Sequence, residues 1–574
     1  MRRLALAVMI AWPALAAAPA RTAQVFDEPT RTFARSLDLR AWQRLAVQHG
    51  GRLKVLDSFA RNRVKAFFGR RDIDGTGAVF SFLEVYFNAP AYLDRPVIKV
   101  HGAALRRRLA ASAPAPAGDA IRRTGRAAPI DLMGPDTPLL RVPSVQAIRG
   151  RPPKIDDARL GSLAALPGQL AGDLSLRPSV QRVQAGLDAF VSGDALRVVP
   201  PAGPGRIYAA PEELPILADT GWEQFQPDDA LALHRRFADL GAAWRERHAD
   251  RANALLTELA GTLQARGGSA YPPAWRREVE CVHNRLRGFT VAWIGFAAAS
   301  VVLLAGLVFA RARARTAGLV ILAGSTIFLA FGVAVRWVLS GRGWRLPPLT
   351  NEYESVLAAA LLGALAALVL ERLFRQGIFA LAAALVATAS LLGAFFEPGG
   401  MHGDINAATG ILVSPILTWH VATLVMGYAM IGMSLVASVA YLLAAWRQTR
   451  DAAFARPAPS ASADLTSPPA GALAQLDRCN LVLIQLAACM LTIGVALGAV
   501  WADRAWGRWW GWDPKETWAL MTCIIYVGVI HLRFTCSDRR RGLWTAVCSI
   551  AGSAVMAFTW YGVNRLLAGL HSYA

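Results

Sequence analysis

The stretch FTVAWIGFAAASVVLLAGLVFA, residues 289–310, decides the fold class, because it contains no charged side chain. A helix that crosses a bilayer requires roughly 20 consecutive, mainly apolar residues. Seven further segments of this kind follow it. The eight expected spans are 289–310, 316–339, 353–370, 376–396, 415–446, 481–501, 517–534 and 543–566. The pattern predicts an all-α polytopic membrane domain over residues 289–574.

The composition of the 574 residues agrees with a membrane protein. Hydrophobic residues make up 54% and charged residues only 18%, whereas roughly a quarter of a soluble protein is charged. The formal net charge is +21. Its excess follows the predicted membrane topology, which argues against nucleic-acid binding. The 6 cysteines include no CxxC pair, which excludes a disulfide scaffold and a zinc ribbon.

The N-terminal half differs in character from the predicted membrane domain. Residues 1–20 carry two arginines, a short apolar run and then small residues, which is typical of a signal peptide; an uncleaved anchor is the alternative. Residues 21–285 contain no apolar run long enough to span a bilayer. Leucines, Phe237 and Trp244 recur at helical spacing over 228–266. We expect a mainly helical, exported soluble domain over 21–285.

The loop charges predict the orientation of the spans. With residues 21–285 outside, the loops expected inside carry 13 arginines, whereas the outer loops and rim carry 7 cations. An excess of Lys and Arg on the cytoplasmic side is the usual pattern in membrane proteins. The signal peptide and the loop charges therefore predict the same orientation.

A tryptophan-rich segment, WADRAWGRWWGWDPKETW, occupies residues 501–518 between the sixth and seventh spans. In this orientation it lies on the outer face, where its indoles would form a flat apolar platform for a large planar ligand. The alternative is an ordinary belt of tryptophans at the membrane interface. The candidate ligand-binding residues are Trp506, Trp509, Trp510, Trp512 and Asp513.

Four histidines lie beyond residue 289, and three of them are candidate ligands. His420 and His571 are expected at the outer face, where two imidazoles could ligate the iron of a porphyrin from opposite sides. The alternatives are a backbone hydrogen bond for His420 and a fraying terminus for His571. His531 is expected near the inner end of its span. It could be a haem ligand lower in the membrane, and the alternative is a polar residue at the cytoplasmic rim. His402 is more typical of a solvated loop.

These motifs together resemble a known family. Trp506-Gly-x-Trp-Trp-x-Trp-Asp-Pro-Lys-Glu-Thr-Trp518 resembles the WWD signature of the haem-handling proteins of cytochrome c maturation, and most closely the CcsA/ResC branch of system II. The segments Asn351-Glu-Tyr-Glu-Ser355 and Gly569-Leu-His-Ser-Tyr573 resemble further motifs of that branch. Trp509 stands where the family has Tyr. The resemblance covers roughly residues 290–574.

The resemblance implies a site and its ligand. Haem b would lie against residues 506–513 as a transiently bound substrate, with His420 and His571 as axial ligands and His531 as a transit ligand. The chain would be the haem-binding subunit of a holocytochrome c synthase that forms thioethers with the CxxCH motif of apocytochrome c. No residue of the chain is identified as catalytic.

The resemblance also implies a location and partners. The membrane would be the bacterial inner membrane, with residues 21–285 and the segment 501–518 on the periplasmic side. A CcsB/ResB-like membrane protein would complete the machine, and thiol-reducing proteins would act indirectly. Residues 51–61 resemble exported parts of large fused CcsA-type proteins, which favours a docking role for this domain. Two other functions stay open: a haem exporter or carrier without synthase activity, and a transporter of another solute.

Overall fold

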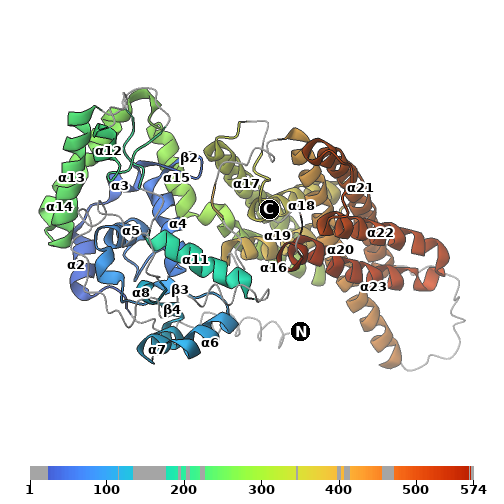
Figure 1. Ribbon diagram of the computed structural model, residues 1–574. Helices are drawn as coiled ribbons and strands as arrows, with labels where there is room; N and C mark the ends of the chain where they lie inside the picture. Colours follow the sequence, from blue (N-terminus) through green and yellow to red (C-terminus); the bar gives the residue numbers. More distant parts are fainter. Residues whose placement is uncertain are drawn as a thin grey trace, which may run out of the picture. The chain divides into compact units, whose positions relative to one another are not determined.

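The computed structural model describes residues 24–113, 115–132, 176–191, 196–201, 207–219, 226–343, 347–396, 403–405, 414–454, 471–567 and 569. The chain divides into two compact units, an N-terminal unit, Met1–Cys281, and a C-terminal unit, Val282–Ala574. Figure 1 shows the elements of both units along the sequence.

The N-terminal unit is mainly helical, as expected, and its described residues also contain two short antiparallel sheets. Its elements are α2 (Glu28–Ser36), α3 (Arg40–Gln43), β1 (Ala46–His49), β2 (Arg52–Val55), α4 (Leu56–Phe68), α5 (Ala78–Phe87), η1 (Ala89–Tyr92), β3 (Ile98–Lys99), α6 (Ala103–Ser112), α7 (Ala115–Thr124), β4 (Arg126–Ala127), α8 (Pro129–Leu132), α11 (Arg177–Val191), α12 (Leu214–Asp219), α13 (Pro227–Arg245), α14 (Ala249–Gly267) and η3 (Gly268–Ala270). Helix α15 (Ala274–Arg285) connects the unit to the rest of the chain.

An aromatic core around one buried carboxylate holds the N-terminal unit together. Glu84 is fully buried and accepts hydrogen bonds from Arg247 at 2.6 and 2.7 Å, from Trp244 Nε1 at 2.8 Å and from the Tyr92 hydroxyl at 2.8 Å. Burial raises the pKa of Glu84, but the hydrogen bonds and charge of Arg247 outweigh it, so that the pKa lies below its usual value. Helix α5 is therefore joined to α13 by the hydrogen bond from Trp244 and to Arg247, just beyond α13, by a satisfied ion pair.

The first strand pair explains the motif at residues 51–61. Strands β1 and β2 are joined by Gly50 and Gly51, whose φ angles of 61° and 74° suit a two-residue hairpin turn. Arg52 then forms a buried ion pair of 2.8 Å with Glu280 of α15. Ser58 donates a hydrogen bond of 2.7 Å to the same carboxylate. The motif therefore attaches α15 to the N-terminal unit.

One cysteine belongs to the N-terminal unit. Cys281 is 4% exposed, and its thiol lies 3.9 Å from the carbonyl oxygen of Gln43. Burial, with Asp57 as the next cause, raises the pKa of this thiol to about 12. Cys281 is therefore a packed, protonated side chain at neutral pH.

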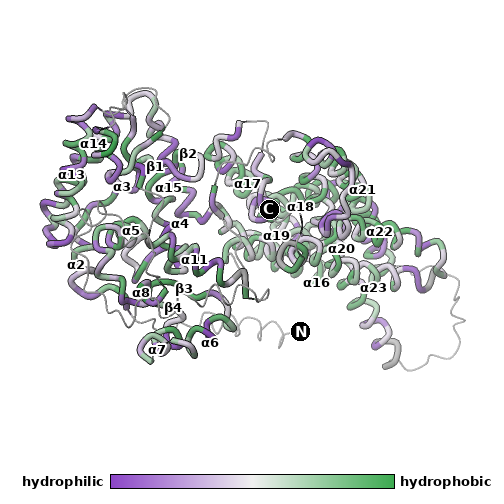
Figure 2. The backbone as a smooth tube through the Cα atoms, viewed as in Figure 1, coloured by the Kyte–Doolittle hydropathy of each residue, from purple (hydrophilic) through white to green (hydrophobic). Residues whose placement is uncertain are grey.

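The C-terminal unit is a bundle of long apolar helices (Figures 1 and 2). Its elements are η4 (Arg287–Ala292), α16 (Trp293–Val308), α17 (Ala312–Ser340), α18 (Glu352–Phe374), α19 (Ile378–Phe396), α20 (Pro415–Phe454), α21 (Ala472–Trp506), α22 (Pro514–Thr535), α23 (Asp538–Ala557), the π-helix η7 (Phe558–Gly562) and α24 (Val563–Leu566). Within the described residues, 8 helices are long and apolar enough to cross a membrane. The predicted all-α fold with eight spans is confirmed.

Two of the helices exceed the thickness of a bilayer. Helix α20 has 40 residues and α21 has 35. At a rise of 1.5 Å per residue these correspond to roughly 60 and 50 Å, against about 40–45 Å for a bilayer with its polar interfaces. The two helices pack along one another. The surplus length of α20 agrees with the length of the fifth expected span, 415–446.

A second buried carboxylate organises the C-terminal unit. Glu354 is fully buried in α18 and pairs with Arg336 and Arg342, each at 3.0 Å. Thr350 donates its backbone N–H and its hydroxyl to the same carboxylate. Arg336 also donates to the carbonyl oxygens of Gly403 and Asp404, both at 2.8 Å. The pair therefore joins the end of α17, the start of α18 and the chain at 403–405.

Replacing this carboxylate tests its importance for stability. We expect Glu354→Gln to lower the unfolding temperature of the detergent-purified chain, because it leaves two buried guanidinium groups without a counter-charge. Breaking such a pair costs about 3–5 kcal/mol. Thermal unfolding followed by tryptophan fluorescence measures the effect. Glu352→Gln, the same change on the partly exposed first residue of α18, is the matched control; equal midpoints for the two variants would contradict the prediction.

Candidate functional site

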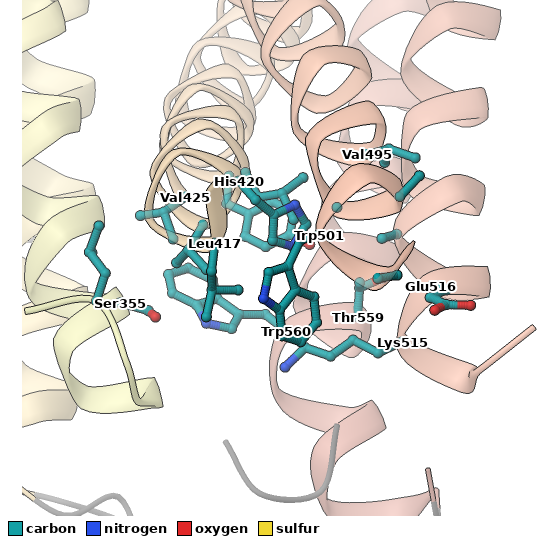
Figure 3. A pocket seen from close by; sticks show the side chains of 18 of the residues that line it. Ser355, Leu417, His420, Val425, Val495, Trp501, Lys515, Glu516, Thr559 and Trp560 are labelled. Atoms are coloured by element: carbon teal, nitrogen blue, oxygen red, sulfur yellow. The ribbon is translucent and has the colours of Figure 1, made fainter. Parts of the chain in front are cut away.

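A cleft opens at one end of the helix bundle in the C-terminal unit (Figure 3). Its walls come from residues at the start of α18, in α20, in α21, in the loop after α21, at the start of α22 and in η7: 349–355, 417–428, 495–502, 509–510, 515–519 and 559–560. The cavity volume is about 160 Å³, below the roughly 300–1,000 Å³ of common ligand pockets, and the cleft is open to the outside.

His420 lies in this cleft, held by a hydrogen bond across two helices. Its Nδ1 is 2.7 Å from the carbonyl oxygen of Gly494 in α21. Because a carbonyl can only accept, Nδ1 carries the proton and Nε2 carries the lone pair. An imidazole that ligates a metal usually has its other nitrogen fixed in this way. His420 therefore has the tautomer and the support of a metal ligand.

A glycine in α21 makes room for this ring. A Cβ at Gly498 would lie 2.5 Å from Cε1 of His420 and 2.8 Å from Nδ1, which no real side chain could do. Any other residue at this position would push the imidazole away from Gly494. Gly498 thus leaves space for the imidazole, and Gly494, one helical turn earlier, supplies the carbonyl that fixes it.

The tryptophan-rich loop is shorter than the predicted segment 501–518. Helix α21 continues to Trp506 and ends at Gly507, whose φ of 68° is left-handed. Helix α22 begins at Pro514, directly after its cap Asp513. Seven residues, 507–513, therefore remain outside the helices, and we call them the Trp loop. Helix caps, and not the tryptophans, set its ends.

A capping box fixes the Trp loop to α22. The Asp513 carboxylate accepts from Lys515 N at 3.1 Å, while Glu516 Oε2 accepts from Asp513 N at 3.2 Å and from Gly511 N at 2.8 Å. The Asp-Pro-Lys-Glu motif thus has a structural role at the start of α22. Asp513 itself is 6% exposed, and it is not among the residues that line the cleft.

The candidate tryptophans occupy different positions. Trp509 and Trp510 line the cleft, together with Trp501 of α21. Trp506 packs edge-to-face against Trp501 with ring centroids 6.3 Å apart, and Trp512 packs in the same way against Trp510 at 5.9 Å. Trp506 and Trp512 are not among the cleft-lining residues, and Trp512 is 71% exposed.

The cleft also has a polar edge. Lys515 and Glu516 line it from α22, opposite Asn351, Glu352 and Ser355 at the start of α18. Figure 3 shows the Lys515 side chain extending from α22 along the lower edge of the cleft, with Ser355 on the far wall. Within the described part of the chain, the buried Nε1 of Trp510 has no hydrogen-bond acceptor. An ammonium group and an indole N–H suit an anionic edge of a ligand.

The other candidate histidines are not brought to the cleft by the described residues. His531 is exposed, and its Nδ1 lies 2.9 Å from the carbonyl oxygen of Val527. It is 16 residues beyond Lys515 on the same helix, roughly 24 Å along the axis. His571 and His402 lie outside the described residues. Gly569 is described, and a Cβ there would lie 2.5 Å from Oδ1 of Asp513.

Sequence reasoning missed several residues of the cleft. Tyr428 and Trp560, whose ring centroids are 5.4 Å apart, come from α20 and from η7. The π-helical turn at Phe558–Gly562 is a distortion that often occurs at functional sites. Neither residue carries a sequence signal of its own. By contrast, the spacing of Gly494 and Gly498 could have indicated a close approach to α21.

Fold and site together define a polytopic membrane protein with a tryptophan- and histidine-lined cleft at one end of its bundle. Residues 349–571 match the sequence model of the family described as cytochrome C assembly protein. The CcsA cytochrome c biogenesis protein of Prochlorococcus marinus is 32% identical over 264 residues, 43% of this chain and 81% of that protein. CcsA of a Synechococcus strain is 31% identical over 299 residues, 49% of this chain and 96% of that protein.

The chain belongs to the CcsA family of cytochrome c biogenesis proteins. It is also similar to the protein NrfI of Wolinella succinogenes, with 30% identity over 360 residues, 60% of this chain. The matched region spans 37% of the length of NrfI. The matches confirm the expected CcsA-type identity and, with the eight apolar helices, the prediction of a multi-pass membrane protein of cytochrome c biogenesis.

The capping box provides a test of how the Trp loop is held. We expect Glu516→Ala to speed hydrogen exchange of the amides of Gly511 and Asp513 about tenfold or more, because each loses a carboxylate acceptor. Hydrogen–deuterium exchange of a peptide spanning 507–513 measures it. Glu516→Gln keeps an acceptor oxygen and should give an intermediate rate. Unchanged exchange in Glu516→Ala would show that the loop is held by other contacts.

Proposed function

We propose that this protein binds haem b in the cleft and presents it for covalent attachment to the CxxCH motif of apocytochrome c. The observation that supports this most directly is the position of His420 in an apolar, tryptophan-lined cleft. Its Nδ1 donates a hydrogen bond to the Gly494 carbonyl, so that Nε2 carries the lone pair. Haem is the substrate here, and membership of a cytochrome c biogenesis family supports haem as the ligand.

His420 and His571 are the proposed axial ligands of the haem iron. Two neutral imidazoles give six-coordinate iron, which is protected from oxygen and held in one orientation. One ligand must then leave so that the histidine of CxxCH can replace it. Gly569 lies beside Asp513 at the start of α22. That position supports a role for the C-terminal residues near the Trp loop.

The tryptophans would position the porphyrin plane, and the polar edge would orient it. Trp501, Trp509 and Trp510 offer apolar faces to the cleft, and Trp506 and Trp512 pack edge-to-face against Trp501 and Trp510. Lys515 and the indole N–H of Trp510 would pair with the propionates, leaving the vinyl groups at the opposite side for the two thiols of CxxCH. Work of this kind is positioning and exclusion of water, and it requires no acid–base residue in this chain.

The proposed setting is the bacterial inner membrane. The N-terminal unit and the Trp loop would face the periplasm, in agreement with the distribution of arginines between the loops. A CcsB/ResB-like membrane protein, the apocytochrome as client and, indirectly, thiol-reducing proteins are the proposed partners. His531, far from the cleft along α22, would hold haem in transit. The N-terminal unit would dock the client or the membrane partner.

The first test removes the iron ligand. We expect the purified chain to show a low-spin, b-type absorption spectrum after dithionite, and His420→Ala to retain only a minor fraction of the haem. Added imidazole should restore part of it by filling the vacant position. His571→Ala should behave in the same way. His234→Ala, which removes an imidazole whose Nδ1 lies 2.9 Å from the Pro211 carbonyl of the N-terminal unit, is the control. Normal haem content and cytochrome c yield in both ligand variants would contradict the proposal.

A second test displaces the ligand without removing it. Gly498→Ala should weaken haem binding about tenfold, since loss of the group that orients a ligand histidine costs 10- to 100-fold in metal affinity. Gly324→Ala in α17, where a Cβ would meet nothing within 4 Å, is the control and should bind haem normally. Equal affinity of the two variants would show that the position of His420 does not matter for haem.

A further inference from the structure

Four cationic residues of the N-terminal unit converge at the short β3–β4 sheet. Lys99 of β3 and Arg126 of β4 are direct partners in the antiparallel register. Arg106 belongs to α6, and Arg70 follows the end of α4. Like charges directly opposite one another destabilise a strand pair. The fold therefore holds together charges that repel.

The geometry brings the Lys99 and Arg106 charges close to one point, beside Arg126, the cross-strand partner of Lys99. Gly125, with a φ of 67°, precedes β4, and the position that a Cβ would take there is 3.5 Å from Lys99 Nζ and 3.5 Å from Arg106 Nη1. Arg126 is 4% exposed, and its guanidinium lies 3.8 Å from the centroid of the Phe68 ring. Its Nε donates to the carbonyl oxygen of Phe68 at 3.3 Å. Arg126 is thus held by the ring and the backbone carbonyl of Phe68, and not by a carboxylate.

No counter-charge for this cluster is found within the described part of the chain. Lys99, Arg106, Arg126 and Arg70 have no salt bridge to a described carboxylate, and Nε of Arg106 is buried without a hydrogen-bond partner. The negative charge of Asp74 acts on Arg126 only at a distance, without a salt bridge. One carboxylate oxygen of Asp74 accepts hydrogen bonds from the backbone N–H groups of Val25 and Phe26, both at 2.7 Å. The acid is therefore engaged elsewhere.

The titration behaviour of the cluster agrees with uncompensated repulsion. Burial lowers the pKa of Lys99, and Arg126, Arg106 and Arg70 lower it further. Burial and the charge of Arg70 lower the pKa of Arg126 to about 10. With a pKa of about 10, Arg126 still carries its charge at neutral pH. A bound anion would relieve the desolvation and the repulsion together.

We propose that Lys99, Arg106 and Arg126 form a binding site for an oxyanion of the phosphate class, either free phosphate or a phospholipid head group. Free phosphate carries up to two negative charges and several strong acceptor oxygens, whereas a single carboxylate would leave two of the three charges uncompensated. A phospholipid head group presents the same kind of oxyanion with one negative charge. Two guanidinium groups and an ammonium group are the usual ligands of such an anion. This site lies in the N-terminal unit and is independent of the proposed haem cleft.

Phosphate binding to the full-length, detergent-purified chain tests the site. Equilibrium dialysis with radiolabelled inorganic phosphate, at constant ionic strength set by sodium chloride, gives the dissociation constant. We expect Lys99→Gln and Arg106→Gln each to weaken binding about tenfold or more, since each removes a charge-assisted contact. Arg107→Gln, an exposed residue of the same helix, is the matched control and should bind like the parent.

Thermal unfolding gives a second readout that a damaged fold would not produce. Without phosphate, Lys99→Gln should unfold at the same temperature as the parent or higher, because it relieves repulsion. Phosphate should raise the midpoint of the parent and leave that of the variant unchanged. A variant that unfolds earlier in both buffers would indicate a structural role for Lys99 and overturn the proposal.

Nanodiscs separate the two sources of the anion. Midpoints raised by phosphatidylglycerol but not by phosphatidylcholine, and only while Lys99 and Arg106 are present, would assign the site to a lipid head group. Binding of inorganic phosphate alone would assign it to the free anion. If neither probe discriminates the parent from Lys99→Gln, the proposal is wrong. Haem absorbance should be unchanged in all of these variants.

Discussion

The pairing of Glu354 with Arg336 and Arg342 is the constraint on which the C-terminal unit depends. Inside an apolar bundle each of these charges would be costly alone, so their pairing fixes how the ends of α17 and α18 meet. The same carboxylate accepts a hydrogen bond from the Thr350 backbone N–H. The Asn351 side chain caps α18 by accepting a hydrogen bond of 2.9 Å from the Glu354 N–H. Thr350 and Asn351 also line the cleft. The wall of the cleft at the start of α18 therefore depends on the ion pairs of Glu354 with Arg336 and Arg342.

The remaining walls are fixed by the backbone. A carbonyl of α21 orients His420, Gly498 gives the ring its space, and a carboxylate of α22 holds the Trp loop by two amides. None of these devices requires a ligand to be present. A cleft built in this way is organised before binding, so less ordering is required when a large rigid molecule enters.

The sequence predicted the membrane fold well because bilayer thickness is a constraint that each span meets alone. Helix ends were less predictable: the capping box of Asp513 and Glu516 has a local signature, but Asp513 was instead predicted from the sequence to bind the ligand. Topology alone placed His420 beside tryptophans, whereas its support by α21 depends on packing between helices. The fold of the N-terminal unit could not be predicted, because contacts such as Glu84 with Arg247 join residues that are distant in sequence.

The single cysteine of the N-terminal unit has a consequence for the redox environment in which the protein would work. One thiol cannot form a disulfide within the unit, and Cys281 is buried and protonated. The unit is stabilised by its aromatic core and its buried ion pairs instead. Many exported domains lose stability when their disulfides are reduced. The N-terminal unit has no disulfide of its own to lose, so under the proposed function the electron donors that keep the thiols of a client reduced would not unfold it.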